Sequence, residues 1–213
     1  MGADFPCSER RSPSRSAAGR DGNDTMHVCL AAKPCRHPET SAVTRMLTYP
    51  ELLRAMDESG ADYVLMGLGA AAAYGSTLAS NDFDFFIRPD PAHVDRARNA
   101  FRSLGMTESF PAIASSNLIA AEATVRFADP LGGPFVDLMT HISGPTFDEV
   151  WRDHVVRDYQ GMRLRIASLE HIIESKRAAN RAKDRYSLKR LKADLGDQIK
   201  EARSAYRTRR KRL

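Results

Sequence analysis

The sequence of 213 residues has little cysteine and no long apolar run. Its three cysteines, Cys7, Cys29 and Cys35, all lie near the N-terminus, so the rest of the chain cannot be a disulfide-stapled secreted domain. No stretch of about 18 consecutive apolar residues is present, which argues against a transmembrane helix. The N-terminus also lacks the apolar segment of a secretory signal. These absences predict a cytoplasmic protein that does not contact a membrane.

The first 45 residues differ in composition from the rest of the chain. They are rich in Ser, Arg, Gly, Pro and Ala and show no sustained hydrophobic period, which predicts disorder. The segment Met46-Leu-Thr-Tyr-Pro-Glu is typical of a natural start. We therefore interpret residues 1–45 as a disordered N-terminal extension, and as a hypothesis attribute them to a start codon that was assigned too early, with Met26 as the alternative start.

The remaining chain alternates between strand-like and helix-like segments, which predicts an α/β fold with a mixed sheet backed by helices. One domain is expected over residues 46–195, and a basic helical tail over residues 196–213. A short apolar run that ends at a glycine predicts a buried strand at 63–66, and strand-like patterns predict further strands at 82–88, 123–127, 135–139, 155–158 and 162–166. Period-3.6 patterns and capping residues predict helices at 48–60, 70–74, 89–104 and 169–179, and another that opens near Thr146. Residues 109–121 give no clear pattern.

Two acidic residues occupy one face of the second predicted strand. Asp82 and Asp84 point to one side, while Phe83 and Phe85 point to the other. Two neighbouring carboxylates repel each other unless a cation lies between them, and paired carboxylates are typical ligands of Mg²⁺. An amphipathic edge strand with a solvated acidic face is the alternative interpretation.

The stretch before that strand is rich in glycine and alanine, and together they resemble the polymerase-beta-type nucleotidyltransferase superfamily. The match is closest to small bacterial proteins related to the AbiEii abortive-infection toxins. Their pattern is a strand, two glycines, an Ala-rich helix, a glycine, and Arg-x-Thr-x-Asp-x-Asp. The residues in register with it are Gly67, Ala70, Gly75, Ser80, Asp82 and Asp84. Two positions differ, because Gly67-Leu68-Gly69 replaces adjacent small residues and Leu78 replaces the arginine.

A third carboxylate, Asp137, is an isolated charge within the apolar strand Phe135-Val-Asp-Leu-Met. A buried carboxylate without a partner is costly, and a metal shared with Asp82 and Asp84 would supply that partner. The resemblance implies the same role, because the superfamily has a third carboxylate on a later strand. The alternative is an edge-strand residue that points to water.

The last predicted helix also resembles the family, through the segment Ser-Leu-Glu-x-Leu-Ile-x-x-Lys-x-x-x-x-Arg-x-x-Asp. Lys176, Arg181 and Asp184 are in register with it, and Ser187 stands where the family has a further Asp. Lys176 and Arg181 are suited to binding phosphate. From Lys176 to Leu213 there are fifteen Lys and Arg against four Asp and Glu, whereas the whole chain has a net charge of only +5. Such a concentration of positive charge binds polyanions such as RNA, and a solvated basic helix is the alternative.

The resemblance, which covers about Leu47 to Leu195, implies a nucleotidyltransferase fold with a mostly antiparallel sheet and transfer of a nucleoside monophosphate from an NTP. Two Mg²⁺ ions would be held by Asp82, Asp84 and Asp137, and the nucleotide would contact Gly67, Gly69, Ser76, Lys176 and Arg181. The acceptor would be an RNA, such as tRNA, or a protein, and the enzyme would be the toxin of a toxin–antitoxin pair with a cognate antitoxin. A catalytically inactive nucleotide-binding relative and a basic RNA-binding protein remain as alternatives.

Overall fold

The computed structural model describes residues 45–78 and 80–210, so the predicted N-terminal extension lies outside the described residues except for Arg45. The elements in chain order are α1 (Tyr49–Glu58), β1 (Tyr63–Met66), α2 (Gly67–Ala72), β2 (Asp82–Ile87), α3 (Pro91–Ser103), β3 (Thr107–Glu108), α4 (Ser115–Ala120), β4 (Val125–Ala128), β5 (Phe135–Met139), α5 (Phe147–Arg152), β6 (Val155–Tyr159), β7 (Met162–Ile166), α6 (Leu169–Ala179) and α7 (Ala182–Arg210).

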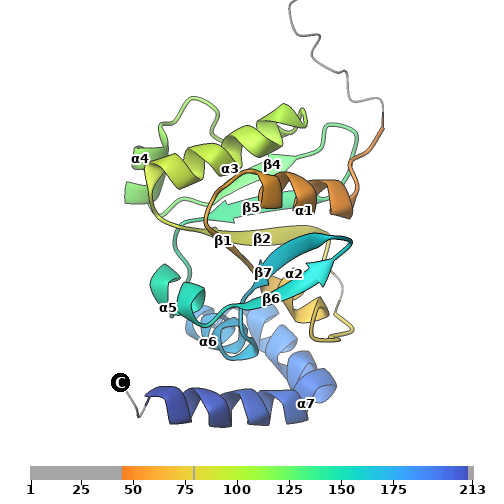
Figure 1. Ribbon diagram of the computed structural model, residues 1–213, viewed down its shortest axis with the longest axis vertical. Coiled ribbons are helices and arrows are strands. Elements are labelled where there is room, and N and C mark those ends of the chain that lie inside the picture. The colour runs from red at the N-terminus through yellow and green to blue at the C-terminus, as the bar shows by residue number, and fades with distance from the viewer. Residues whose placement is uncertain (1–44, 79, 211–213) are drawn as a thin grey trace, which may run out of the picture. The chain divides into compact units, whose positions relative to one another are not determined.

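The strands form a seven-stranded sheet in the order β3-β4-β5-β2-β1-β7-β6. Its pairings are antiparallel except for β1 with β7 and β2 with β5, which are parallel. Helices α1, α3 and α4 lie on one face of the sheet, and α2, α5, α6 and α7 lie on the other (Figure 1). The predicted α/β class with a mixed, mostly antiparallel sheet backed by helices is thus confirmed.

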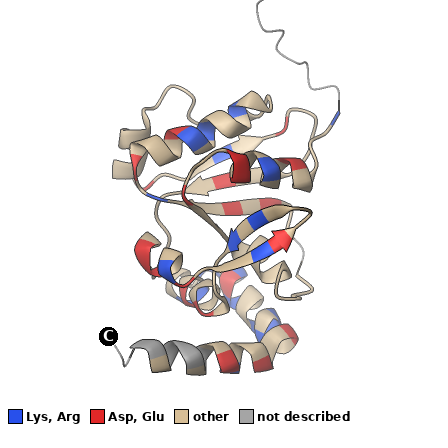
Figure 2. Cartoon of the chain, viewed as in Figure 1, with Lys and Arg blue, Asp and Glu red and all other residues tan. Residues whose placement is uncertain are grey.

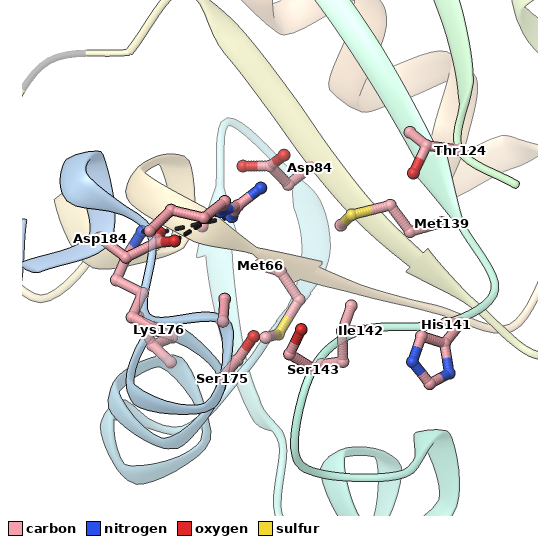
Figure 3. Close-up of a pocket in the computed structure, with 14 residues that line it drawn as sticks. Met66, Asp84, Thr124, Met139, His141, Ile142, Ser143, Ser175, Lys176 and Asp184 are labelled. Carbon is pink, nitrogen blue, oxygen red and sulfur yellow. Dashed lines mark hydrogen bonds and ion pairs between the residues drawn. The ribbon is translucent and has the colours of Figure 1, made fainter. Parts of the chain in front are cut away.

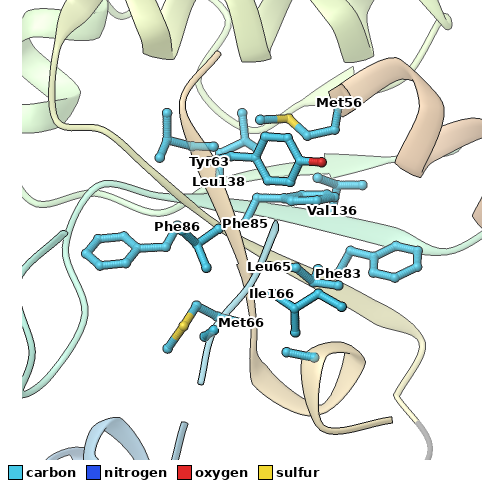
Figure 4. Close-up of a cluster of buried hydrophobic side chains, with 14 of the residues drawn as sticks. Met56, Tyr63, Leu65, Met66, Phe83, Phe85, Phe86, Val136, Leu138 and Ile166 are labelled. Carbon is cyan, nitrogen blue, oxygen red and sulfur yellow. The ribbon is translucent and has the colours of Figure 1, made fainter. Parts of the chain in front are cut away.

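Alternation along the central strand β2 separates the hydrophobic core from the polar face. The Phe83 ring packs 5.1 Å from that of Tyr49 in α1, and the Phe85 ring 6.0 Å from that of Phe101 in α3. Figure 4 shows Phe83 and Phe85 among the buried side chains of β1, β5 and β7. Phe86 points the other way, with its ring 5.3 Å from Phe147 in α5. Asp82 and Asp84 share the face of Phe86, so they are directed toward the layer that contains α5, α6 and α7.

Element boundaries follow the sequence pattern most closely where the pattern is local. Strands β1, β5 and β7 match their predicted ranges, and the β6–β7 hairpin forms as expected. Helix α2 begins at Gly67, three residues earlier than predicted, and Gly67 takes a φ of +65° directly after the extended Met66. The unassigned residues 109–121 contain α4, which is only six residues long.

Helix α7 changes direction within its length. Leu195 has non-helical angles, φ −124° and ψ 22°, at the residue where we place the end of the domain. The backbone beyond it is helical to Arg210, yet Ile199 is still buried in the core, so this part of the expected tail packs against the domain. The boundary at residue 195 stays a prediction. Within residues 45–78 and 80–210, no helix is long and apolar enough to cross a membrane.

Candidate active site

The sheet brings together the three carboxylates that the sequence singles out. Asp84 of β2 lies directly opposite Asp137 of β5 in the parallel register, and Asp82 lies two residues before Asp84 on the same face. The predicted common face of Asp82 and Asp84 therefore extends to a residue more than fifty positions later in the chain. This places three negative charges on one small area of the sheet.

Gly67 allows the Asp84 side chain to occupy its position. A Cβ atom at residue 67 would lie 1.9 Å from Oδ2 of Asp84, far inside any permitted contact. The φ of +65° at Gly67 also favours glycine. Gly69 has a different role, since its Cβ would meet the Phe83 ring at 3.3 Å on the core side. The first glycine thus serves the site and the second serves packing.

A cavity of about 280 Å³ lies between β1, β2 and α6 (Figure 3). It is lined by residues of both predicted motifs, the glycine turn with its aspartate and the basic segment at the end of the domain. At its charged end it is lined by Gly67, Asp84, Lys176, Arg181 and Asp184, and elsewhere by Met66, Thr124, Met139, His141, Ile142, Ser143, Ile172, Ser175 and Ala179. Carboxylate, glycine turn, lysine and arginine come from three separate segments of sequence. The cavity therefore combines a cationic wall with an acidic wall.

The cationic wall is organised by Asp184 at the start of α7. Nε of Arg181 donates to Oδ2 of Asp184 at 2.6 Å, and Nζ of Lys176 lies 3.8 Å from Oδ1. Burial disfavours the ionised form of Asp184, yet Arg181 and Lys176 hold its pKa below the ordinary value. Burial lowers the pKa of Lys176, and the charges of Asp184 and Asp84 oppose that effect. Asp184 therefore holds Lys176 and Arg181 at the edge of the cavity.

Asp84 is in a much less favourable environment for its charge. Burial, with smaller contributions from the nearby charges of Asp137 and Asp82, raises the pKa of Asp84 to about 6, although Lys176 acts in the opposite direction. A cation bound at this position would relieve the repulsion that these carboxylates exert on one another. Perturbed carboxylates of this kind are common in functional sites.

Sequence reasoning missed Arg126, which binds the third carboxylate. Nε and Nη2 of Arg126 donate to Oδ1 and Oδ2 of Asp137, both at 2.7 Å, and Nη2 lies 3.8 Å from Oδ2 of Asp82. The guanidinium also lies 5.3 Å from the centre of the Phe135 ring. Its hydrogen bonds to Asp137, together with the surrounding carboxylates, raise the pKa of Arg126. The cationic partner that burial of Asp137 requires is thus an arginine in this structure.

The carboxylates do not by themselves form a complete metal site in this arrangement. In the part of the chain that the structure describes, no group of three or more His, Cys, Asp or Glu side chains is placed to hold a metal ion. Both oxygens of Asp137 accept hydrogen bonds from Arg126, whereas Asp84 lines the cavity and Asp82 has the longer contact of 3.8 Å with Nη2 of Arg126. A pair of carboxylates fits Mg²⁺, which binds through one or two of them together with phosphates and water. The assignment of Asp82, Asp84 and Asp137 as metal ligands stays a prediction.

Four of the predicted site residues do not line this cavity, namely Gly69, Ser76, Asp82 and Asp137. Oγ of Ser76 lies 3.4 Å from Oδ2 of Asp194, and the backbone N–H of Thr77 donates to the same oxygen at 2.9 Å, so α7 holds the loop after α2. Gly69 and Asp82 line a second, more apolar hollow of about 630 Å³ beside the β6–β7 hairpin. The cavity therefore brings together Gly67, Asp84, Lys176 and Arg181, while Asp82 and Asp137 lie beside Asp84 on the sheet without lining the cavity, and Ser76 and Gly69 lie elsewhere.

Basic side chains continue outward from the cavity along α7 (Figure 2). Those that are exposed on its first half are Lys183, Arg185, Lys189, Arg190 and Lys192. The charge of Lys183 is near enough to influence both Asp84 and Lys176. This basic surface therefore begins at the site rather than at a remote part of the molecule.

The chain matches no model of a known protein family and no curated protein. Among the solved structures that resemble it is a proposed nucleotidyltransferase from Thermotoga maritima at 16% identity and a TM-score of 0.46, over 68% of this chain and 94% of that one. A proposed nucleotidyltransferase from Helicobacter pylori aligns at 21% identity and a TM-score of 0.34, over 60% of this chain and 55% of that one. JHP933, also from Helicobacter pylori, aligns at 21% identity and a TM-score of 0.37, over 67% of this chain and 66% of that one. Likenesses of this size assign neither a family nor a function to the chain.

Proposed function

We propose that this protein is a nucleotidyltransferase that moves a nucleoside monophosphate from a nucleoside triphosphate to an acceptor. The observation that supports this most directly is the cavity in which Asp84, packed on the Gly67 turn, faces Lys176 and Arg181. Phosphoryl transfer requires little covalent chemistry from the protein, and it depends on positioning and on compensation of negative charge. A cavity with one acidic and one cationic wall is suited to that task.

Asp82 and Asp84 are the residues that would hold Mg²⁺. The raised pKa of Asp84 and the nearby charge of Asp82 make this pair a suitable donor set for a hard cation. When bound, Mg²⁺ would neutralise charge on the triphosphate and on the pyrophosphate that leaves. Two Mg²⁺ ions, as the family resemblance implies, would need Asp137 as well.

The chain's own cations would act on the phosphates. Lys176 is held near Asp84 by Asp184 and would offset charge on the leaving pyrophosphate, and Arg181 would bind a phosphate through two N–H groups. Backbone N–H groups of the Gly67–Gly69 turn would contact the same phosphates. These residues would orient the triphosphate so that the acceptor oxygen attacks the α-phosphorus in line with the departing pyrophosphate.

An RNA is the acceptor that the basic surface of α7 favours, since it leads directly from the cavity and would bind a polyanionic backbone without sequence preference. A tRNA or a protein acceptor, a role as the toxin of a toxin–antitoxin pair with its antitoxin as partner, and a place in the cytoplasm are part of this proposal. The engagement of Asp137 by Arg126 favours one alternative, a catalytically inactive relative that binds nucleotides. The same basic surface is also compatible with an RNA-binding protein without catalysis.

The test is label transfer by the full-length protein. The protein is incubated with Mg²⁺, each α-labelled NTP in turn, and total cellular RNA and protein. Asp82→Ala or Asp84→Ala is expected to lower transfer by about a hundredfold or more, the usual effect of removing one group that stabilises the transition state. Asp197→Ala is the matched control, because the side chain of Asp197 is 98% exposed and pairs only with Lys200 at 2.9 Å among the described residues.

The outcomes separate the alternatives. If wild type and Asp197→Ala transfer label and the Asp82→Ala and Asp84→Ala variants do not, the labelled product identifies both the base of the NTP and the class of acceptor. Full activity in Asp84→Ala would refute the assignment of Asp84. If no NTP yields transfer, nucleotide binding measured by calorimetry supports the inactive relative, and binding of RNA that is independent of Mg²⁺ and Asp82 supports the RNA-binding protein.

A further inference from the structure

Arg126 occupies both carboxylate oxygens of Asp137, which a metal ion bound to Asp137 would also need. The guanidinium donates to both oxygens of Asp137 at 2.7 Å, which is the two-point geometry that gives arginine–carboxylate pairs their strength. Its Nη2 is also 3.8 Å from Oδ2 of Asp82. A divalent cation that uses Asp137 together with Asp82 or Asp84 would therefore have to replace the arginine as the charge that separates these carboxylates.

Strand pairing places the three competing side chains next to one another. Arg126 lies opposite Asp137 in the antiparallel pairing of β4 with β5, and Asp137 lies opposite Asp84 in the parallel pairing of β5 with β2. Three adjacent strands thus present arginine, aspartate and aspartate in one row on the same face of the sheet. The Arg126 side chain is 50% exposed, while that of Asp137 is 12% exposed. The arginine can therefore rotate toward solvent without disturbing the core, whereas the aspartate has to stay.

We propose that Arg126 is a built-in counter-ion that competes with divalent metal for Asp137, so that the free protein offers only Asp82 and Asp84 to a cation. The inference rests on the metal role that the proposed function gives to these carboxylates. It assigns to Arg126 a positioning role, because its own charge decides whether the third carboxylate takes part in metal binding. Arg126 and metal are then mutually exclusive partners of Asp137.

A purely structural ion pair would look the same in the structure but would behave differently in a metal titration. If Arg126 only stabilises the sheet, its removal lowers stability and leaves metal affinity unchanged. If it competes for Asp137, its removal strengthens metal binding, and the gain disappears when Asp137 is also removed. A double-mutant cycle measures this coupling directly.

The experiment is calorimetric titration of the full-length protein with Mg²⁺ in the absence of nucleotide. The set comprises wild type, Arg126→Gln, Asp137→Asn, the double variant Arg126→Gln/Asp137→Asn and Asp82→Asn. Arg126→Gln is expected to bind Mg²⁺ about tenfold to a hundredfold more tightly, the range over which partners of metal ligands usually act. Asp137→Asn alone should change affinity little, and in the double variant the gain should be lost.

Controls exclude general electrostatic and folding effects. Arg163→Gln removes the same charge from an exposed position on β7, which is separated from β2 by β1, and it should leave affinity unchanged. Thermal unfolding without metal shows whether each variant folds. If Arg126→Gln does not, Arg126→Lys keeps the charge but loses the two-point grip, and it should give a smaller gain in the same direction.

Several outcomes would overturn the inference. One is equal Mg²⁺ affinity of wild type and Arg126→Gln, while the separate variant Asp82→Asn no longer binds Mg²⁺. The proposed metal site would then stand, and the competition by Arg126 would be refuted. A gain that persists in the double variant, or that Arg163→Gln reproduces, would show an effect of overall charge. Absence of Mg²⁺ binding in every variant overturns both this inference and the metal role in the proposed function.

Discussion

Asp84 and Asp137 are the same side chain at paired positions of adjacent strands, yet their surroundings differ completely. Asp137 is held at both oxygens by Arg126. Asp84 faces a cavity, packs on a glycine, and has its pKa raised to about 6 by burial and by neighbouring carboxylates. We therefore expect Asp137 to contribute to the stability of the fold and the ionised Asp84 to oppose it. A charge that the fold keeps at a cost to stability is a reasonable mark of function.

Removing Arg126 should have the largest effect on stability. Arg126→Ala leaves the buried carboxylate of Asp137 without its partner, and a loss of about 2 to 3 kcal/mol is expected, below the value for a fully buried pair because the arginine is half exposed. Urea unfolding measures it, with Arg163→Ala as the control within about 0.5 kcal/mol of wild type. If both variants lose equally little, Asp137 does not depend on Arg126, and the contrast with Asp84 fails.

Gly67→Ala should lower stability by disturbing the position of the Asp84 side chain. The new Cβ would meet Asp84 at 1.9 Å, and alanine also disfavours a φ of +65°. We expect a loss of about 2 kcal/mol, of which backbone strain accounts for about half. Gly161→Ala is the matched control, since it has a φ of +79° and its Cβ would meet nothing within 4 Å.

The difference between the two glycine variants isolates the clash with Asp84. Adding Asp84→Ala to Gly67→Ala should recover that difference, because the colliding atoms are then absent. Equal losses in Gly67→Ala and Gly161→Ala would mean that the Asp84 side chain moves aside freely, and that Gly67 does not position it.

The sequence predicts one side of this comparison much better than the other. The common face of Asp82 and Asp84 follows from period-two alternation within one strand. The strand predicted at 135–139, which matches β5, places Asp137 on a separate strand. The pairing of Arg126 with Asp137 depends on the register of β4 against β5, which no local pattern specifies. The same holds for Ser76, whose partner Asp194 lies 118 residues away on α7. Alternation within a strand predicts the face on which a side chain lies, whereas its partner on another element is determined by the tertiary structure.

A signal for Arg126 does exist in the sequence, although it is weak. The segment Val125-Arg-Phe-Ala alternates, and it places a single basic residue between two buried ones, Val125 and Phe127. The cationic partner that Asp137 needs can be an arginine on an adjacent strand as well as a metal. Arg126, on a neighbouring predicted strand, is a candidate for that partner.

Asp84→Asn should have the smallest effect, and it should be opposite in sign to the others. Because the pKa of Asp84 in the folded protein is about 6, above its ordinary value of 3.8, the folded state binds this proton more tightly than the unfolded state. The ionised group therefore destabilises the fold progressively as pH rises from about 4 to 6. The neutral asparagine avoids that loss. Taken in full, the shift corresponds to about 3 kcal/mol, but Asp84 is only partly buried and lines an open cavity, so screening by water should reduce the gain to about 1 kcal/mol above pH 6. Below pH 4 the variant and wild type should show almost no difference.

Urea unfolding of wild type, Asp84→Asn and Asp137→Asn at pH 4 and pH 7.5 measures this difference. Asp137→Asn should lose stability at pH 7.5, because Arg126 is left without its carboxylate, and the opposite signs of the two variants are what the comparison requires. A loss in Asp84→Asn at pH 7.5 would mean that the ionised carboxylate is stabilised by Lys176 more than it is destabilised by burial. Asp84 would then be a structural ion-pair partner like Asp137, and the strongest support for its role in catalysis would be gone.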